Sequence, residues 1–546
     1  MVHAILAFMR WLALFAVLSL HAQTVADLVV TNAHIYTADP AHPTASVLAV
    51  KDGKILAVGE RFMGKATRIL DAHGAMVMPG FIDSHGHVEA LGDSLETIDL
   101  RGVKSEAEVA AMVNRAAGTS KPGEWIRGRS WDQNLWPGKQ FPSKESLDKA
   151  APGNPVILSR VDGHASWVNQ RALDLSDVNG RTPDPPGGKI LRTASGEATG
   201  VLIDRAQGLV ARKVPPPSAE QIRQRLARAT RECARLGITS VHDAGVSAED
   251  LAGYRALIAA NDMPVRVNAM IGGVGPLWEQ CKRSGPEIGE FLTVRSIKLY
   301  ADGALGSRGA ALLAPYSDDP DNTGLLISSE DLIRQVSLDA VKTGFQVCTH
   351  AIGDRGNRTV LNAYAAALRG PNQKRFRVEH AQVVAPGDFA RFEKYNIIAS
   401  IQPTHATSDM GWAETRLGPQ RILGAYAWQT FLKLGVPVAS GSDFPVEQPN
   451  PVWGFYSAVS REDHEGNPKG GWYPAQRMSR AEALQSWTQA GAYAAFEDKI
   501  KGSLTPGKLA DFVMLSSDIM QIPEQEIWRA RVTMTVVGGR VVFPEE

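Results

Sequence analysis

The sequence predicts an α/β fold, and three observations support this class. Short apolar runs alternate with helical stretches through the middle of the chain, as in folds with parallel sheets. There are eight such runs, and several of them end at or beside a polar residue suited to chemistry. Strand-like segments also occur at both ends of the chain. Together these features predict a TIM (β/α)8 barrel, whose active site lies at the carboxyl ends of its strands, with a β-domain added to it. The eight predicted strands are 81–87, 238–243, 265–270, 294–299, 346–350, 376–380, 397–402 and 436–443.

The N-terminus differs from the rest of the chain. Arg10 precedes an apolar run over residues 11–20 that is too short to span a bilayer comfortably, and Ala22 offers a small residue for cleavage. We therefore expect a signal peptide over residues 1–22 and an exported protein, periplasmic or secreted. The alternatives are an uncleaved anchor or a wrongly assigned start. After cleavage we expect no stable membrane insertion, because no other run is apolar and long enough to span a bilayer.

Both ends of the mature chain contribute short strands. Residues 23–78 hold three of them and a Lys51-Asp52-Gly53 hairpin turn, and residues 498–546 hold three more and a Gly538-Gly539 turn. Neither segment is large enough to be stable alone, so we expect one small β-domain built from both. The barrel domain then covers residues 79–497.

About 150 residues separate the first two barrel strands, far more than a barrel needs. We read residues 104–225 as an insertion that caps the barrel mouth, with Trp131, Trp136 and Trp167 as its aromatic lining. Two alternatives stay open. The tryptophans can instead form the insertion's own core, and the runs at 125–132 and 155–164 can be barrel strands that shift our count.

Composition limits the partners. The chain has 546 residues, and its 58 Lys and Arg balance 58 Asp and Glu, which gives no electrostatic sign of nucleic-acid binding. The three cysteines, Cys233, Cys281 and Cys348, are too few for a disulfide framework, although one pair could form in an oxidising compartment. We expect a small-molecule substrate and no nucleic-acid partner. A homodimer is the oligomeric state that we consider for this chain.

The first barrel strand ends in His85-Gly86-His87. Residues two apart on a strand point to the same side, so both imidazoles can reach one point. Neutral imidazole is a common zinc ligand, whereas the alternative is a pair of hydrogen-bonded histidines. Other strand ends add imidazoles, a carboxylate and an amine, which supports a metal site. These residues are Lys298, His350, His380 and Asp443.

Lys298 is unusual in this set, because a protonated ammonium repels a cation and offers no lone pair. It fits a metal site if it is neutral, or if carbon dioxide has converted it to a carbamate that bridges two ions. The alternative is a structural or substrate-binding charge.

These segments resemble the amidohydrolase superfamily, and within it the YtcJ-like branch related to N-substituted formamide deformylases. The motifs that carry the resemblance are residues 79–87, 297–308, 349–354, 378–382, 441–445 and 502–512. The resemblance covers nearly everything after the signal peptide. It implies a distorted TIM barrel, a composite β-sandwich domain and one or two divalent ions, usually zinc.

By the same resemblance, His85, His87 and Asp443 hold the first ion, and His350 and His380 hold the second, with carbamylated Lys298 as the bridge. A bound cation lowers the pKa of its water towards 7, and Asp443 then acts as general base and acid. The function expected is hydrolysis of a non-peptide amide-type C–N bond through this metal-activated hydroxide. The alternatives are an esterase, an acyl-amino-acid or dipeptide hydrolase, and a binding protein that kept only the fold.

Several further residues are candidates for substrate binding. His405 follows the seventh strand, and His164 lies in the insertion; both are carried over from the resemblance. Arg308 and Asp302 follow the fourth strand, where a loop salt bridge is the alternative. Trp131 would line the pocket. Glu379 precedes a ligand histidine, so strand alternation predicts that it points to the opposite face, as part of an ion pair in the barrel wall.

Overall fold

The computed structural model describes residues 25–160, 165–185 and 188–545. The predicted signal peptide and His164 lie outside these residues. The chain forms two compact units. Unit 1 comprises Met1–Gly86, Arg231–Val246 and Pro264–Glu546, and unit 2 comprises His87–Thr230 and Ser247–Met263. None of the helices in the described ranges combines the length and hydropathy needed to cross a membrane.

Unit 1 contains the predicted barrel. Eight parallel strands pair in chain order, and a short strand β17 (Glu287–Ile288) adds to β18 at the side. Closure comes from Asp443, whose backbone N–H donates to His85 O at 2.7 Å, and from a parallel bridge between Gly86 and Phe444. The barrel prediction is therefore confirmed. Its strands are β8 (Phe81–Gly86), β15 (Ile238–Val246), β16 (Arg266–Gly272), β18 (Leu292–Tyr300), β19 (Gln346–Ala351), β20 (Arg377–His380), β21 (Ile398–Ile401) and β22 (Val438–Ser440).

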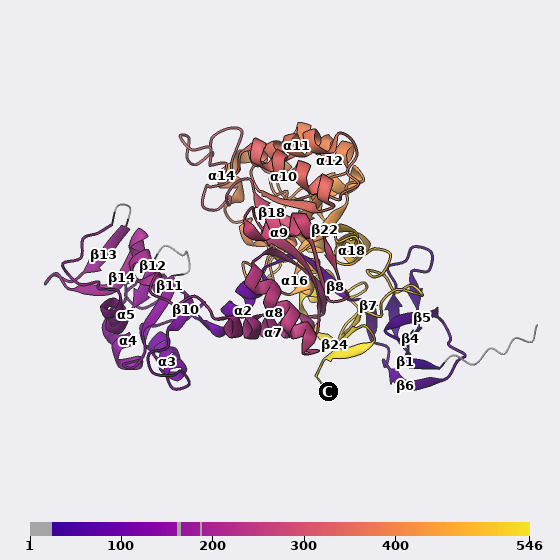
Figure 1. Cartoon of the computed structure of the whole chain (residues 1–546), viewed down its shortest axis with the longest axis horizontal. Helices are drawn as coiled ribbons and strands as arrows, with labels where there is room; N and C mark the ends of the chain where they lie inside the picture. Colours follow the sequence, from indigo (N-terminus) through magenta and orange to yellow (C-terminus); the bar gives the residue numbers. More distant parts are fainter. Residues whose placement is uncertain (1–24, 161–164, 186–187, 546) are drawn as a thin grey trace, which may run out of the picture. The chain divides into compact units, whose positions relative to one another are not determined.

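Helices follow the barrel strands, and their ends carry clear sequence signals. Ser329 caps α10 by accepting from the N–H of Leu332, and Gly344 ends that helix in the left-handed conformation. Figure 1 shows α10 and α11 side by side near β18. The helices of unit 1 are α9 (Pro276–Ser284), α10 (Glu330–Thr343), α11 (Asp354–Leu368), α12 (Phe389–Tyr395), α13 (Pro403–Asp409), α14 (Ala413–Arg421), α15 (Trp428–Lys433), α16 (Pro451–Ser460), α17 (Arg480–Ser486) and α18 (Gln489–Ala494).

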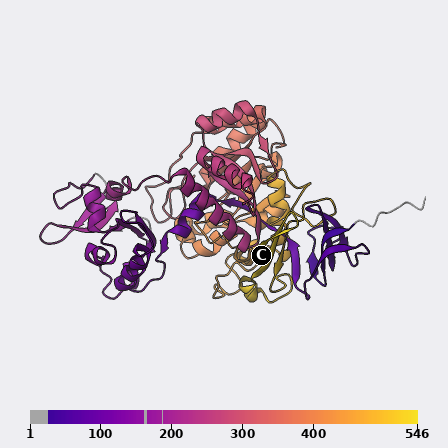
Figure 2. The ribbon, with the colours of Figure 1, turned by 60° about the horizontal axis from the view of Figure 1, so that its bottom comes forward.

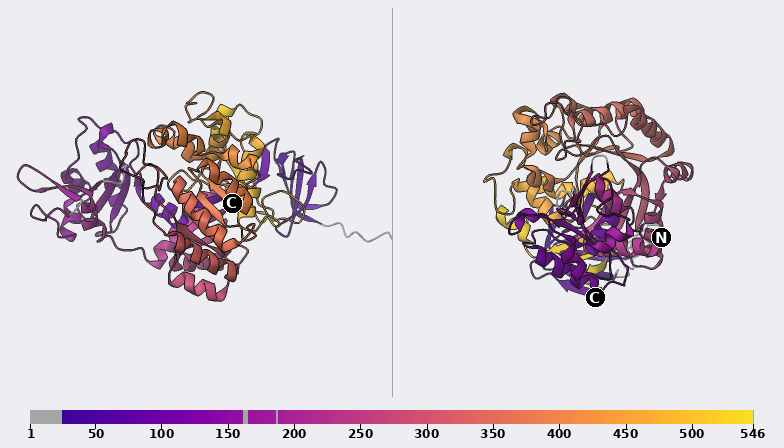
Figure 3. Two further views of the ribbon diagram at one scale, coloured as in Figure 1. Left: turned by 90° about the horizontal axis from the view of Figure 1, so that it is seen from above. Right: turned by 90° about the vertical axis from the view of Figure 1, so that its left-hand side faces the viewer.

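The β-domain of unit 1 joins the two ends of the chain. Strand β7 pairs with β23 in antiparallel register, with Val77 opposite Met514. Figures 2 and 3 show the indigo N-terminal strands beside the yellow C-terminal ones. The first sheet has the order β5 (Lys54–Gly59), β4 (Val47–Lys51), β1 (Ala26–Thr31), β6 (Ala66–Asp71). The second has the order β25 (Arg540–Phe543), β24 (Val532–Val537), β23 (Phe512–Leu515), β7 (Met76–Pro79), β2 (His34–Tyr36), β3 (Thr44–Ala45).

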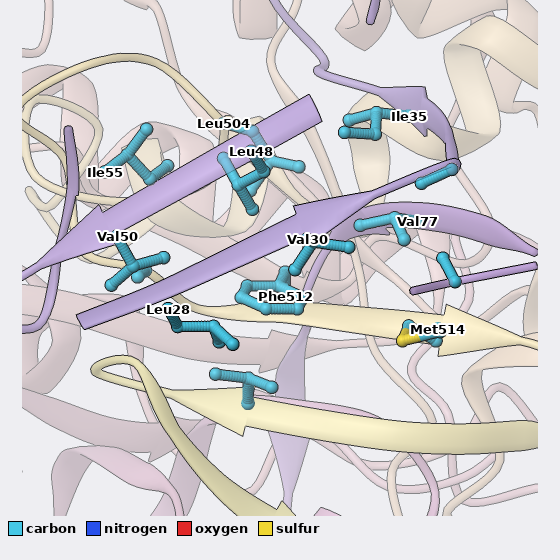
Figure 4. Close-up of a cluster of buried hydrophobic side chains, with 14 of the residues drawn as sticks. Leu28, Val30, Ile35, Leu48, Val50, Ile55, Val77, Leu504, Phe512 and Met514 are labelled. Carbon is cyan, nitrogen blue, oxygen red and sulfur yellow. The ribbon is translucent and has the colours of Figure 1, made fainter. Parts of the chain in front are cut away.

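Residues from both ends also share one hydrophobic core. Val30, Leu48 and Phe512 are fully buried in it, and Figure 4 shows Phe512 beside Val30. Alternating apolar residues on β1 and β4 place one side of each strand against this core. The β-domain therefore depends on both ends of the chain, as the sequence predicts.

Unit 2 has its own six-stranded sheet, in the order β13-β14-β12-β11-β10-β9. The run at 125–132 forms β10 of this sheet, and the described part of the run at 155–164 forms β11, so neither is a barrel strand. Trp131, Trp136 and Trp167 lie together in one hydrophobic core of this unit. Its strands are β9 (Ile98–Asp99), β10 (Ile126–Trp131), β11 (Val156–Arg160), β12 (Ala165–Val168), β13 (Gly188–Arg192) and β14 (Ala198–Asp204). Its helices include α2 (Val88–Glu96), α3 (Glu106–Ala117), α4 (Lys144–Ala150), α5 (Gln170–Leu175), α6 (Gly208–Ala211) and α8 (Ala248–Ala259), and α7 (Ala219–Arg235) leads into unit 1.

Candidate active site

Four predicted residues converge at the carboxyl ends of the barrel strands. Lys298 Nζ lies 3.1 Å from His85 Nε2, and Asp443 Oδ1 lies 3.6 Å from the same nitrogen. The ring centroids of His85 and His380 are 4.9 Å apart. All four side chains are buried. Strands β8, β18, β20 and β22 are distant in sequence, and barrel closure brings their ends together.

Two groups of side chains have the donor atoms and spacing for a metal ion. His85, His87 and Asp443 form one group, and His380, His405 and Asp443 form the other. In each group the ligand atoms lie within 4.8 Å of one another. Imidazole nitrogens with a carboxylate oxygen are the donor set that zinc prefers. These residues therefore fit a divalent cation.

His85 is oriented by a buried ion pair. Its Nδ1 donates to Glu379 Oε2 at 2.5 Å, and Arg377 Nη2 donates to the same oxygen at 2.9 Å. Burial alone would raise the pKa of Glu379, but the Arg377 guanidinium holds this pKa well below its usual range. Burial lowers the pKa of His85 to about 4. The imidazole is therefore neutral at pH 7, and its Nε2 lone pair faces Lys298 and Asp443.

The predicted ion pair of Glu379 is confirmed, because its carboxylate pairs with Arg377, but the prediction that Glu379 points away from the site is wrong. Glu379 also contacts the predicted ligand His85. Regular alternation fails here because His380 has φ +73° and Ala381 has φ +43°. This left-handed turn lets two consecutive side chains serve the same site.

His380 is held in a similar way by an amide. Its Nδ1 lies 2.7 Å from Gln402 Oε1, so Nδ1 donates the proton and Nε2 keeps a lone pair. Burial and the neighbouring His350 lower the pKa of His380 well below its usual value. Like His85, His380 is a neutral imidazole, and its Nε2 carries a lone pair that can bind a cation.

Lys298 is 1 % exposed, and burial lowers the pKa of its amine. Its Nζ lies 4.8 Å from the ring centre of Tyr300. A buried amine with a lowered pKa loses its proton more easily, which suits a neutral or carbamylated side chain beside a cation. Carbamylation of Lys298 stays a prediction.

His350 and His405 differ in their surroundings. The ring of His350 lies 4.5 Å from that of His380, but its Nε2 is 3.4 Å from Gly303 O and 3.5 Å from Asp302 Oδ1. His405 Nε2 lies 3.8 Å from Asp443 Oδ2, and its ring is stacked on that of His380. The predicted position of His405 next to the site is thus observed, although its role in binding substrate stays a prediction.

Three residues predicted to bind substrate have structural contacts. Asp302 is fully buried and accepts three backbone N–H groups that hold the loop after β18. Arg308 forms an ion pair with Asp318 at 2.8 Å, the alternative that we left open. Trp131 is fully buried, and its indole N–H donates to Leu158 O. Trp131 therefore belongs to the insertion's own hydrophobic core, which was the alternative to lining the pocket.

Two residues at the site were not singled out from the sequence. Arg377 joins Glu379 to His242 Nδ1 at 2.9 Å, and Gln402 orients His380. In the sequence, these two residues could have been recognised as a charged and an amide side chain at otherwise apolar strands. Such side chains are rarely buried without a polar partner, so each indicates a contact at the site.

Comparisons with known proteins agree with this geometry. The profile of the Amidohydrolase family matches residues 68–543. The chain is 37 % identical to Protein LONG AFTER FAR-RED 3 of Arabidopsis thaliana, covering 96 % of this chain and 92 % of the relative. It is 31 % identical to the putative amidohydrolase YtcJ of Bacillus subtilis, covering 93 % and 98 %. It is 28 % identical to the N-substituted formamide deformylase of Arthrobacter pascens, covering 94 % and 97 %.

A solved structure supports the fold as well. An uncharacterized metal-dependent hydrolase from Pyrococcus furiosus superposes with a TM-score of 0.76 at 28 % identity, covering 90 % of this chain and all of that one. With the profile match over most of its length, the chain belongs to the amidohydrolase family.

Proposed function

We propose that this protein hydrolyses a non-peptide amide-type C–N bond of a small molecule, using one or two zinc-like ions. One observation carries the proposal: two neutral imidazoles, each oriented through Nδ1, meet one carboxylate at the barrel mouth. The similarity to an N-substituted formamide deformylase supports a C–N bond as the target.

A divalent ion bound here would lower the pKa of a water molecule and polarise a carbonyl group. His85 and Asp443 would hold it, with His87 from the same motif. Asp443 Oδ1 lies 3.6 Å from His85 Nε2, so this carboxylate would lie beside a water molecule on such an ion and would accept its proton and donate it to the leaving nitrogen. The Arg377–Glu379 pair keeps the Nδ1 proton of His85 in place throughout.

The main alternatives use the same donor set. An ester or an acyl-amino acid would be attacked in the same way, and a binding protein would bind metal without turnover. We favour an enzyme because the donor groups are complete and preoriented, which binding alone does not require.

A substrate panel tests the proposal. Metal-stripped protein is reloaded with zinc and assayed against N-substituted formamides, other small amides, esters and N-acyl amino acids. The expected result is amide hydrolysis that is lost with chelator and restored by zinc. Hydrolysis of the esters alone would show that the enzyme cleaves an ester bond and not an amide bond. Metal binding without hydrolysis of any substrate would favour the binding protein.

We also propose that the mature protein is exported, on the basis of the signal-like N-terminus. Mass spectrometry of the protein from its native cells should find a chain that begins near Gln23 in an extracytoplasmic fraction. An intact N-terminus in the cytoplasm would contradict this.

A further inference from the structure

One arginine side chain crosses the interior of the barrel close to the candidate site. Arg377 projects from β20, and its Nη1 donates to Nδ1 of His242 on β15 at 2.9 Å. In the order of the barrel strands, β15 is the second and β20 the sixth, so these two strands face each other across the ring. Barrel interiors are usually filled by branched apolar side chains, but here Arg377 is only 1 % exposed and His242 is fully buried. A charged contact in this place needs a specific reason.

The guanidinium of Arg377 is held by acceptors from four strands. Nε and Nη2 donate to Glu379 on its own strand, at 2.5 and 2.9 Å. Nη2 also donates to the backbone O of Ser84 on β8 and, at 2.8 Å, to Ser400 Oγ on β21. With His242 on β15, these contacts fix both the position and the plane of the guanidinium. Since such a pair matches two N–H groups to two carboxylate oxygens, the plane of Arg377 also fixes that of the Glu379 carboxylate.

Glu379 in turn determines the orientation of His85. Its Oε2 accepts from Nδ1 of His85 at 2.5 Å, so the position of this oxygen sets the angle of the imidazole ring. The chain of contacts therefore runs from His242 through Arg377 and Glu379 to the candidate metal ligand. Every side chain in it is at most 1 % exposed, so these hydrogen bonds are shielded from bulk solvent.

His242 acts as an acceptor in this chain. A guanidinium has five N–H donors and no acceptor, so Nδ1 of His242 carries the lone pair and Nε2 carries the proton. Burial and the charge of Arg377 lower the pKa of His242 well below its usual value, which keeps the imidazole neutral. Its Nε2 has no hydrogen-bond partner among the residues that the structure describes. An apolar side chain would fill the same space without burying that polar group, so the contribution of His242 is the acceptor that it offers to Arg377.

We propose that His242 is a positioning residue that orients His85 through the buried Arg–Glu ion pair between them. It acts through other residues, from the strand that faces β20 across the barrel. The effect on zinc binding rests on the metal centre of the proposed function. The orientation of His85, however, can be measured without metal or substrate.

Two variants of His242 separate the hydrogen bond from the space that the ring fills. His242→Leu removes the acceptor, whereas His242→Asn keeps one, because Oδ1 of asparagine is bonded to Cγ as Nδ1 of histidine is. Gln346→Leu on β19 is the matched control. Gln346 is equally buried and polar, and its hydrogen bonds within the described ranges go to atoms outside this network.

The first measurement is nuclear magnetic resonance of metal-stripped, full-length protein with isotope-labelled histidine. The proton on Nδ1 of His85 should resonate far downfield, because its hydrogen bond to a carboxylate is short, and its absence in His85→Ala assigns it. We expect His242→Leu to shift or broaden this resonance, and His242→Asn and Gln346→Leu to keep it. The second measurement is zinc affinity by competition with a chelator. We expect about 10-fold weaker binding in His242→Leu and unchanged affinity in His242→Asn and Gln346→Leu.

The outcomes separate this proposal from the proposed function. A wild-type resonance together with wild-type zinc affinity in His242→Leu would overturn the positioning role. Equal losses in His242→Asn would also overturn it, since the shape of the ring would then be the cause, and equal losses in Gln346→Leu would show a general loosening of the barrel instead. A displaced resonance in a protein that binds no zinc or hydrolyses no amide would uphold the role of His242 and refute the proposed function. If His242→Leu does not fold, the nitrogen chemical shifts of wild-type His242 decide: a lone pair on Nδ1 supports the proposal, and a proton on Nδ1 overturns it.

Discussion

Two candidate ligands are oriented through the same ring nitrogen but by different chemistry. His85 donates its Nδ1 proton to the charged Glu379, whereas His380 donates to the neutral amide of Gln402. A carboxylate partner increases the basicity of the opposite nitrogen more than an amide does. The His85 side of the site should therefore bind a cation more tightly.

Glu379→Gln tests this difference. The substitution keeps an acceptor oxygen but removes the charge, so we expect zinc affinity to fall about 10- to 100-fold. A competition titration with a chromogenic chelator measures the loss. Glu414→Gln, on an exposed part of α14, is the control and should keep wild-type affinity. Equal affinities for Glu379→Gln and wild type would refute the orienting role.

Asp443→Asn separates proton transfer from folding. An amide cannot accept the proton of the attacking water, so we expect kcat to fall about 10²- to 10⁴-fold on any amide that the wild-type protein hydrolyses. The thermal midpoint should change far less than the rate. Wild-type kcat in this variant would exclude Asp443 as the general base.

His85→Ala should instead lose metal and activity together. Removal of one nitrogen donor leaves the first group incomplete, so elemental analysis should show at least one ion fewer per chain. A variant that keeps the full metal content and wild-type activity would contradict the site.

The sequence allowed most of the site to be predicted, because strand ends in a barrel converge. His85, His380 and Asp443 were found in this way, and the structure brings them together with Lys298. Glu379 was assigned to the wrong face because the alternation of side chains along a strand assumes regular strand dihedrals. His380, with φ +73°, does not have such dihedrals. Gln402 was missed because its importance comes from a contact between neighbouring strands.

At the scale of elements, closure of the barrel depends on a buried carboxyl group. Asp83 on β8 accepts hydrogen bonds from the backbone N–H and the hydroxyl of Ser442. Ser442 lies two residues after the end of β22. It also accepts from the backbone N–H of His85. This cluster joins the first strand to the last one next to the site.

Burial raises the pKa of Asp83 to about 7, which makes its contribution depend on pH. Since its pKa in the unfolded chain is near 3.8, the unfolded chain releases this proton at a lower pH than the folded protein does, so the folded state loses stability as pH rises from about 4 to about 7 and no further above that. Asn mimics the protonated acid. Between pH 5 and 8, the unfolding free energy of metal-stripped wild type should therefore fall relative to Asp83→Asn by about 2–3 kcal/mol.

Urea unfolding of both proteins at the two pH values measures this change. Asp27→Asn on β1 is the control, because Asp27 is exposed and its pKa is lowered, so no change is expected over this range. A constant difference between wild type and Asp83→Asn would show that Asp83 is ionised throughout.

The elements themselves were largely predictable, because each buried strand is an apolar run bounded by turn residues. The predicted and observed barrel strands agree within a few residues, except that β22 is only Val438–Ser440. The sheet of unit 2 could not be derived from the sequence, because apolar runs such as 125–132 have the same pattern in a barrel and in an open sheet.

At the scale of the whole molecule, the β-domain needs both ends of the chain. Phe512 and Met514 on β23 belong to the same core as Val30 and Val77. Deletion of residues 502–546 would expose this core and leave β7 without its antiparallel partner. We expect the truncated protein to aggregate, measured as loss of soluble yield and of a defined gel-filtration peak.

A control deletion and a point variant make this prediction specific. Removal of residues 545 and 546 alone should leave the protein soluble. Phe512→Ala should cost about 3–5 kcal/mol, because it leaves a cavity in the shared core. A soluble, well-folded 1–501 fragment would show that the N-terminal strands fold without β23.

The pairing of β7 with β23 also sets an order of events during biosynthesis. A ribosome makes Val77 early, but Met514, which lies opposite it, emerges only near the end of translation. The barrel has the same delay, since Asp443 must reach His85 before the ring closes. Nascent chains of this protein therefore carry unpaired strand edges for most of their synthesis, and they should depend on chaperones until release.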